Sequence, residues 1–178
     1  MLFEKLFRPS AARVAGQILY AAAVSQARQP ALYVDLAVPD TIEGRFELHN
    51  LHVLLLLHRL KGQGTAAADA AQALFDTYVG ELDGTLREMG VGDLTVPKRM
   101  RKLGEAFYGR TKAYDAALTD AADGAGLERL IARTLYDEVQ DAPADRMADY
   151  VRRQAAVLAA QPLDEIIAGR PAWAAVVP

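Results

Sequence analysis

The chain of 178 residues contains no cysteine. This absence excludes disulfide bonds, thiolate catalysis, and zinc or iron–sulfur sites built on cysteine. The net charge at pH 7 is only −3, so there is no basic excess of the kind that characterises nucleic-acid-binding proteins. We therefore expect no DNA partner.

Sequence motifs for catalysis are also missing. The glycines of GVGDL at 90–94 follow a predicted helix instead of a strand, and the lysine of a phosphate-binding loop is absent. No serine nucleophile-elbow motif occurs. Asp76 and Asp83 could form a carboxylate pair, but nearby positive charges favour ionised acids over a general acid with a raised pKa. We predict no catalytic residue, no bound cofactor and no metal.

What the sequence does contain is the composition of a helical globular protein, with 52% apolar and 24% charged residues. Alternating runs of β-branched residues are nearly absent. The length suits one domain with a sizeable core. We predict an all-α fold: a single compact multi-helix domain over residues 1–178 with C-terminal helices at 125–168. An apolar tail follows at 169–178, where Trp173 docks on the domain or meets a partner or membrane.

The N-terminal region has basic residues before an apolar run at 14–24, which is the outline of a signal peptide. Gln17 interrupts this run, and we instead predict a helix from after Pro9 to about Arg28. The apolar run is far short of the ~20 residues that a membrane-spanning helix needs. The residues before the helix, LFEKLF at 2–7, predict an amphipathic turn that touches a membrane surface or packs onto the domain.

After a connector at 30–42, predicted to be extended or turn, residues 42–60 form the most apolar helix of the chain. A helix that is apolar on all sides is usually the central buried one. Asp40 or Thr41 can cap its N-terminus. Its three histidines are His49, His52 and His58. The i, i+3 spacing of the first two would suit one metal ion, but no convergent carboxylate supports such a site. Core histidines are the simpler interpretation, and haem ligation is the alternative.

The stretch 76–110 predicts two helices joined by a glycine turn. Apolar residues recur at helical spacing in both: Leu74, Tyr78, Leu82, Leu86 and Met89, then Met100, Leu103, Phe107, Tyr114 and Leu118. Gly90 and Gly92 break the pattern, as glycine does after a helix C-terminus. Thr95 suits the N-cap of the second helix, and Pro97 fits its first turn.

Charge separates these two helices. Residues 76–93 carry five acidic and one basic residue, a net of −4, whereas residues 97–112 carry six basic and one acidic residue, a net of +5. A short turn favours an antiparallel hairpin in which opposite charges face each other. Arg110 would then pair with Asp76 or Asp83. Weak solvated ion pairs are the simpler alternative.

The motif FYGR in the basic helix has two interpretations. In the structural one, Gly109 permits close helix packing, Phe107 enters the core, and Arg110 fixes the hairpin. In the functional one, Tyr108, Arg110 and the cluster KRMRK at 98–102 form a face that binds a partner, since aromatic and arginine residues are favoured at interfaces.

Several segments resemble the ubiquinol–cytochrome c chaperone family of assembly factors for the respiratory bc1 complex. They are QARQPALY at 26–33, VPDTIEGRFELHNLHVLLLLHRL at 38–60, LREMGVGDLTVPKRM at 86–100 and AFYGRTKAYDAAL at 106–118. The resemblance covers roughly residues 18–120, in the family's order. It implies a non-enzymatic chaperone that binds newly synthesised cytochrome b near the ribosome exit tunnel and can contact the inner membrane peripherally. The resemblance begins close to the N-terminus and no acid-poor transit peptide precedes it, so we expect a bacterial cytoplasmic form.

We place the partner-binding surface on the two charged helices and their joint. The candidate residues are Asp76, Asp83, Arg87, Glu88, Gly90, Gly92, Asp93, Lys98, Arg101, Lys102, Phe107, Tyr108, Gly109 and Arg110. Two other functions are open. One is RNA or ribosome binding through the basic helix 97–112, and the other is haem carriage by the histidine-bearing helix 42–60.

Overall fold

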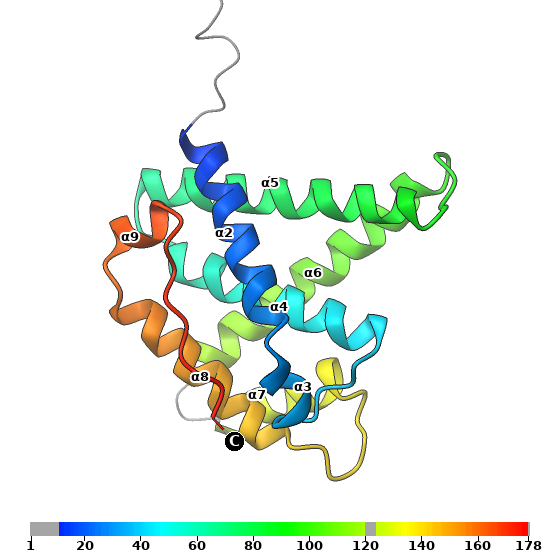
Figure 1. Cartoon of the computed structure of the whole chain (residues 1–178), viewed down its shortest axis with the longest axis vertical. Coiled ribbons are helices and arrows are strands. Elements are labelled where there is room, and N and C mark those ends of the chain that lie inside the picture. The colour runs from blue at the N-terminus through cyan, green and yellow to red at the C-terminus, as the bar shows by residue number, and fades with distance from the viewer. Residues whose placement is uncertain (1–10, 120–123, 178) are drawn as a thin grey trace, which may run out of the picture.

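The computed structural model describes residues 11–119 and 124–177 (Figure 1). Every regular element in these two ranges is a helix, which confirms the all-α prediction. The helices are α2 (Ala11–Ala27), α3 (Pro30–Val34), α4 (Ile42–Leu60), α5 (Thr65–Glu88), α6 (Val96–Thr119), α7 (Gly124–Leu135), α8 (Ala144–Ala160) and α9 (Leu163–Ile167). The predicted amphipathic turn at 2–7 lies outside the described residues. None of the described helices combines the length and apolarity needed to cross a membrane.

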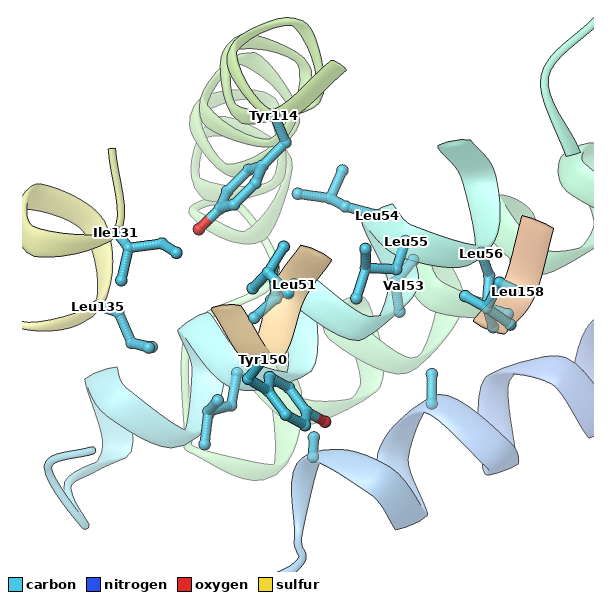
Figure 2. Packing of buried hydrophobic residues seen from close by; sticks show 14 of the residues in the cluster. Leu51, Val53, Leu54, Leu55, Leu56, Tyr114, Ile131, Leu135, Tyr150 and Leu158 are labelled. Carbon is cyan, nitrogen blue, oxygen red and sulfur yellow. The ribbon is translucent and has the colours of Figure 1, made fainter. Parts of the chain in front are cut away.

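Helix α4 lies at the centre of the core, as its sequence predicts. The Thr41 hydroxyl caps it by accepting a hydrogen bond from the backbone N–H of Gly44 at 3.1 Å. All six residues from 51 to 56 are buried, and the five apolar ones, all but His52, belong to the hydrophobic core. Figure 2 shows them between Tyr114 of α6, the apolar face of α7, and Tyr150 of α8. This arrangement buries the middle of α4 on all sides and makes it the scaffold for the other helices.

Helices α2 and α5 cross closely because of one glycine. A Cβ atom at Gly16 would lie 2.5 Å from the backbone carbonyl carbon of Ala73, closer than any real contact allows. The two backbones can therefore approach each other only with glycine in α2 and a small residue in α5. This crossing fixes the first half of α5 against the body of the molecule.

The C-terminal segment is held against α8 by two glutamine side chains. Gln154 donates to the carbonyl of Ala174 and accepts from its N–H, both at 2.8 Å. Gln161 binds the preceding part of the segment through two residues. It donates to the carbonyl of Arg170 at 2.6 Å and accepts from the N–H of Ala172 at 2.8 Å. Trp173, half-buried, lies edge-on to the His52 ring with centroids 5.4 Å apart. The predicted docking of Trp173 is therefore confirmed.

The structure corrects two expectations about the connections. Residues 30–34 form the short helix α3, although the sequence predicts an extended connector; Pro30 begins this helix because proline is compatible with a first turn. The glycines and small residues from Lys61 to Asp69 predict a flexible link, but helix α5 already begins at Thr65 and leaves only a short turn after α4.

Candidate partner-binding site

The charged helices α5 and α6 form the predicted hairpin, whose closed end extends beyond the other helices (Figure 1). We call residues 81–105 the arm. The joint is a hydrogen-bonded turn: Gly90 adopts a φ of +77° directly after α5, and the carbonyl of Gly92 accepts hydrogen bonds from the N–H groups of Thr95 and Val96. The glycine stop is therefore confirmed at Gly90, because that φ strongly favours glycine.

The apolar stripe of α5 is buried only in the body of the protein. Leu74 and Tyr78 are buried, and the Tyr78 hydroxyl donates to the side-chain oxygen of Asn50 in α4 at 2.8 Å. Leu82 and Leu86 are half-buried, and Met89 is 62% exposed. The stripe therefore continues past the core into the arm, where little remains to cover it.

The charges of the arm do not pair across the hairpin. Arg87 binds Asp83 at 2.6 Å and also contacts Asp93, so its ion pairs stay on α5 and the turn. Arg101 lies 3.9 Å from Glu105 on its own helix. Neither arginine joins α5 to α6, and the expectation of facing charges is wrong for both. Exposed pairs of this kind contribute about 0–1 kcal/mol each.

Arg110 has a different partner from the one predicted. Its guanidinium donates two hydrogen bonds to Glu47 of α4, at 2.8 and 2.6 Å. The pair is largely shielded, with 27% of the arginine and 14% of the glutamate side chain exposed. Burial raises the pKa of Glu47, and the Arg110 charge opposes that rise. Arg110 therefore ties α6 to the central helix instead of binding Asp76 or Asp83, and its role is structural.

The FYGR motif divides between core and surface. Phe107 is buried, and its ring lies 4.7 Å from that of Tyr78 and 5.8 Å from that of Phe75. Tyr108 is 66% exposed, with the Lys112 ammonium 5.8 Å from its ring centroid. A Cβ atom at Gly109 would meet nothing within 4 Å, so the close packing expected at this glycine does not occur. Of the four residues, Tyr108 remains the candidate for partner contact.

Tyr108 borders a groove of about 620 Å³ between the end of α4, the start of α5 and the middle of α6. Its lining is mainly apolar or small and includes Leu57, Leu60, Ala68, Ala71 and Phe75. Lys61, Lys112 and Thr111 supply polar groups at its edge. The arrangement is an open apolar groove with a cationic rim, which suits an apolar segment of another protein.

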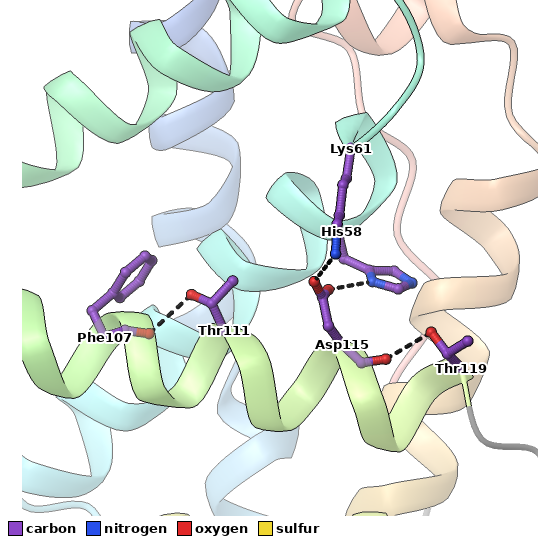
Figure 3. Close-up of polar contacts among 6 residues, drawn as sticks. All are labelled: His58, Lys61, Phe107, Thr111, Asp115 and Thr119. Carbon is purple, nitrogen blue, oxygen red and sulfur yellow. Dashed lines mark hydrogen bonds and ion pairs between the residues drawn. The ribbon is translucent and has the colours of Figure 1, made fainter.

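A three-residue cluster closes one side of this groove (Figure 3). Asp115 of α6 binds the Nδ1 atom of His58 at 2.7 Å and the Lys61 ammonium at 2.5 Å, both at the end of α4. Burial alone would raise the pKa of Asp115, but the hydrogen bonds from Lys61 and His58 outweigh it and hold that pKa below its ordinary value. The cluster fixes the distance between α4 and α6 at the groove.

The remaining basic candidates lie on the outside of the arm. Lys98, Arg101 and Lys102 are exposed, and so is their neighbour Arg99. Glu88 is exposed on the facing helix. These side chains can reach a partner without any rearrangement of the fold.

Asp76 lies apart from the other candidates. It accepts a hydrogen bond from Gln72 at 2.7 Å and borders a second groove, about 830 Å³, between α2 and α5. The structure therefore separates the predicted surface into three parts: the arm, the Tyr108 groove, and the α2–α5 groove.

Two of the three histidines of α4, His49 and His52, serve the core, whereas His58 binds Asp115 beside the groove. The His52 Nδ1 atom lies 2.7 Å from the carbonyl of Leu48, so it carries the proton, and Nε2 accepts from the Tyr150 hydroxyl at 2.7 Å. That hydroxyl in turn accepts from Gln26 at 3.0 Å. Both nitrogens of His52 are thus occupied, which argues against haem ligation by this residue. Within the described residues, no group of three metal-binding side chains gathers.

Two residues that matter at the site were not among the candidates predicted from the sequence. Glu47 was not a candidate, although a charged residue inside the most apolar helix is a signal for a buried ion pair. Leu94 was not a candidate either, and it is 99% exposed at the tip of the arm. A leucine in a turn gives no local sign of whether it is covered.

Comparisons with known proteins agree with the fold and the resemblance. A family model described as ubiquinol-cytochrome C chaperone matches residues 34–173. The chain is 24% identical over 144 residues to the ubiquinol-cytochrome-c reductase complex assembly factor 1 of Xenopus laevis, covering 80% of this chain and 71% of that protein. It is 26% identical over 172 residues to the Drosophila melanogaster protein of the same name, covering 90% of this chain and 64% of the relative.

A solved structure shows the same architecture in three dimensions. The crystal structure of the Cbp3 homolog from Brucella abortus superposes with a TM-score of 0.85 at 36% sequence identity. The match covers 99% of this chain and 98% of that one.

Proposed function

Because the chain belongs to the ubiquinol–cytochrome C chaperone family, we propose that it is a non-enzymatic assembly chaperone that holds newly synthesised cytochrome b during assembly of the ubiquinol–cytochrome c reductase (bc1) complex. The curated relatives are named as assembly factors of that complex, and the chain spans 71% of the frog protein and 64% of the fly protein. It acts in the cytoplasm, peripheral to the inner membrane.

The observation that carries this proposal is the Tyr108 groove. Its apolar lining offers a place for a hydrophobic segment of a membrane protein that has not yet found its partners. Tyr108 supplies a large amphipathic ring at the edge, a residue type favoured in interfaces. Lys61 is already paired with Asp115, and Lys112 adds positive charge at the rim, which suits an acidic residue beside the apolar segment.

Site-specific photo-crosslinking tests the groove directly. A photoreactive amino acid replaces Tyr108, or Val139 as a control that is 62% exposed elsewhere, in cells that make the bc1 complex. We expect a cross-link to cytochrome b from position 108 and none from position 139. A client cross-link of equal yield from both positions, or from neither, contradicts the assignment.

A pair of variants tests whether the groove matters for capture. Ala71→Glu places a charge in the apolar lining, and Val139→Glu places the same charge on an exposed site outside it. We expect the first to reduce co-purification of cytochrome b about ten-fold or more, since it puts an unpaired charge against an apolar segment. The second should have no effect. Circular dichroism shows whether both variants keep their helices.

Ribosome contact is the second candidate role, favoured by the exposure of Lys98, Arg99, Arg101 and Lys102. Salt-dependent retention of the pure protein on ribosomal RNA, lost when these four residues become alanine, supports it. Retention that does not depend on salt or on these residues removes it.

A further inference from the structure

The tip of the arm exposes apolar side chains on both sides of one turn. We call residues 89–94 the tip. Leu94 is 99% exposed and Met89 is 62% exposed. Single exposed apolar residues are ordinary, but these two share a projecting turn (Figure 1). Backbone hydrogen bonds hold it, from the N–H of Val91 to the carbonyl of Leu86 at 3.0 Å and from Thr95 to Gly92 at 2.7 Å. The apolar pair is thus presented by a defined backbone.

Positive charge flanks this tip on its α6 side, although the whole arm carries five basic and five acidic residues. Residues 87–102 carry five basic residues against Glu88 and Asp93, a net charge of +3, although the whole chain has a net charge of −3. Arg87 already contacts Asp93 and so compensates that acid. The other four basic residues are exposed on the first two turns of α6, and we call them the basic quartet: Lys98, Arg99, Arg101 and Lys102.

We infer that the tip and the basic quartet together form a contact site for an anionic lipid bilayer. Met89 and Leu94 enter the boundary between headgroups and acyl chains, and the quartet binds lipid phosphates next to them. Neither signal suffices alone, because stable peripheral binding takes both apolar burial and charge attraction.

The shape of the site favours a lipid surface over the other possible partners. The apolar pair sits on a convex turn that projects from the molecule, whereas a specific protein interface needs a broad surface of ~800 Å² per partner. RNA would use the quartet but has no use for two aliphatic side chains at the tip. A fluid bilayer accepts a small convex apolar tip without matching its shape.

The position of the site along α6 relates it to the groove. Twelve residues separate Val96 from Tyr108 on the same helix, which corresponds to about 18 Å. Binding by the tip would therefore hold the groove a short distance above the membrane, where a nascent membrane protein emerges. The lipid site rests on its own observations and stands or falls separately from client binding.

Vesicle flotation of the full chain tests the inference. The probes are vesicles of phosphatidylcholine alone and of phosphatidylcholine mixed with phosphatidylglycerol. We expect the chain to float with the mixed vesicles at low salt and to stay unbound with the neutral ones. Equal binding to both, or binding to neither, overturns the proposal.

Two sets of variants separate insertion from charge attraction. Met89→Asp with Leu94→Asp should weaken binding to the mixed vesicles by roughly ten-fold or more, since each buried apolar side chain contributes substantially. Changing the quartet to glutamine should weaken it by up to roughly a thousand-fold. The control is Val34→Asp with Ile42→Asp, two apolar residues that are 78% and 72% exposed away from the arm. The control should bind like the unmodified chain.

The outcomes distinguish the alternatives. If the quartet variant loses vesicle binding but the tip variant does not, the binding is charge attraction alone. That result overturns the lipid site, because RNA phosphates would attract the quartet in the same way. Loss with the control as well shows a general effect of added negative charge and overturns it too. The photo-crosslink from position 108 reports on client binding in the same variants, so failure of one proposal is visible without failure of the other.

Discussion

Ten of the nineteen residues of α4 are buried, whereas Val96 is the one buried residue among the twenty-five of the arm. Both regions have helical periodicity and apolar residues at the expected spacing. They differ in what surrounds them: α4 contacts five other helices, whereas the two helical segments of the arm project beyond the body (Figure 1). An apolar helix thus becomes the core in one place, and two charged amphipathic segments become an accessible surface in the other.

This contrast assigns different tasks to the two regions. The body holds its shape through apolar burial and through shielded polar contacts such as Glu47–Arg110 and His52–Tyr150. The arm contributes little to stability and can change its surface residues at small cost. Regions of low local stability are the ones from which binding elements are usually drawn.

Matched leucine truncations should give the largest effect and separate the two regions most clearly. Leu56 has no exposed surface, so Leu56→Ala leaves a cavity in the core. This change should lower the free energy of unfolding by about 2–5 kcal/mol. Leu86→Ala in the arm removes a half-buried side chain and should cost less than about 1 kcal/mol. Urea unfolding followed by circular dichroism measures both. Similar losses for the two would mean that the arm is part of the cooperative core.

Acid should destabilise the body through its buried histidines. Burial lowers the pKa of His49 and of His52 from 6.5 to about 4. Between these values the unfolded chain binds more protons than the folded one, so stability is complete above pH 6.5 and falls as the pH drops toward 4. Each histidine accounts for up to about 3 kcal/mol. Urea midpoints measured across this range should show the loss.

A variant isolates one of the two histidines. The Nε2 atom of His49 is buried and has no hydrogen-bond partner within the described part of the chain, and its ring packs edge-on against Tyr20 and Tyr78. His49→Phe keeps a ring in that place and should remove roughly half of the acid sensitivity. An unchanged dependence on pH would show that other groups cause it.

Removing Arg110 should have a smaller effect than emptying the core, yet a larger one than any ion pair of the arm. Arg110→Met leaves Glu47 shielded without its counter-charge and should cost about 1–3 kcal/mol, a range reduced because both side chains keep some exposure. Arg101→Met, which loses an exposed contact, should change stability by less than about 0.5 kcal/mol.

A double-mutant cycle with Glu47→Gln then measures the coupling directly. We expect the cost of Arg110→Met to shrink when Glu47 no longer carries charge. Additive costs would show that the two residues act independently and that the pair does not hold α6 to α4.

The order and type of the long helices follow from local sequence. Residues 42–60 are the most apolar stretch, Thr41 can accept a hydrogen bond from the first turn, and Gly90 marks a helix end that the structure confirms. Short elements were less predictable. Helix α3 has five residues, and such a length gives no periodicity to detect.

The contacts of the site could be predicted only in part. Tyr108 and the basic quartet are exposed as a charged amphipathic helix suggests, but Arg110 finds its partner 63 residues away in α4. A partner so distant in sequence depends on how the helices cross, which the spacing of apolar residues does not specify. Met89 and Leu94 are apolar yet exposed. Local periodicity could not predict this exposure, because it does not show whether another segment covers a side chain.

The glutamine contacts of the C-terminal segment have a consequence for its own composition. Gln154 and Gln161 grip main-chain atoms, so the methyl groups of Ala172 and Ala174 are not what they recognise. Those two positions can vary in chemistry while the segment keeps its course. The glutamines themselves have no such freedom: a glutamate has the same length but, when ionised, lacks the amide donor. The course of the C-terminal segment is therefore set by Gln154 of α8 and its C-cap Gln161, and not by the side chains of the residues that they bind.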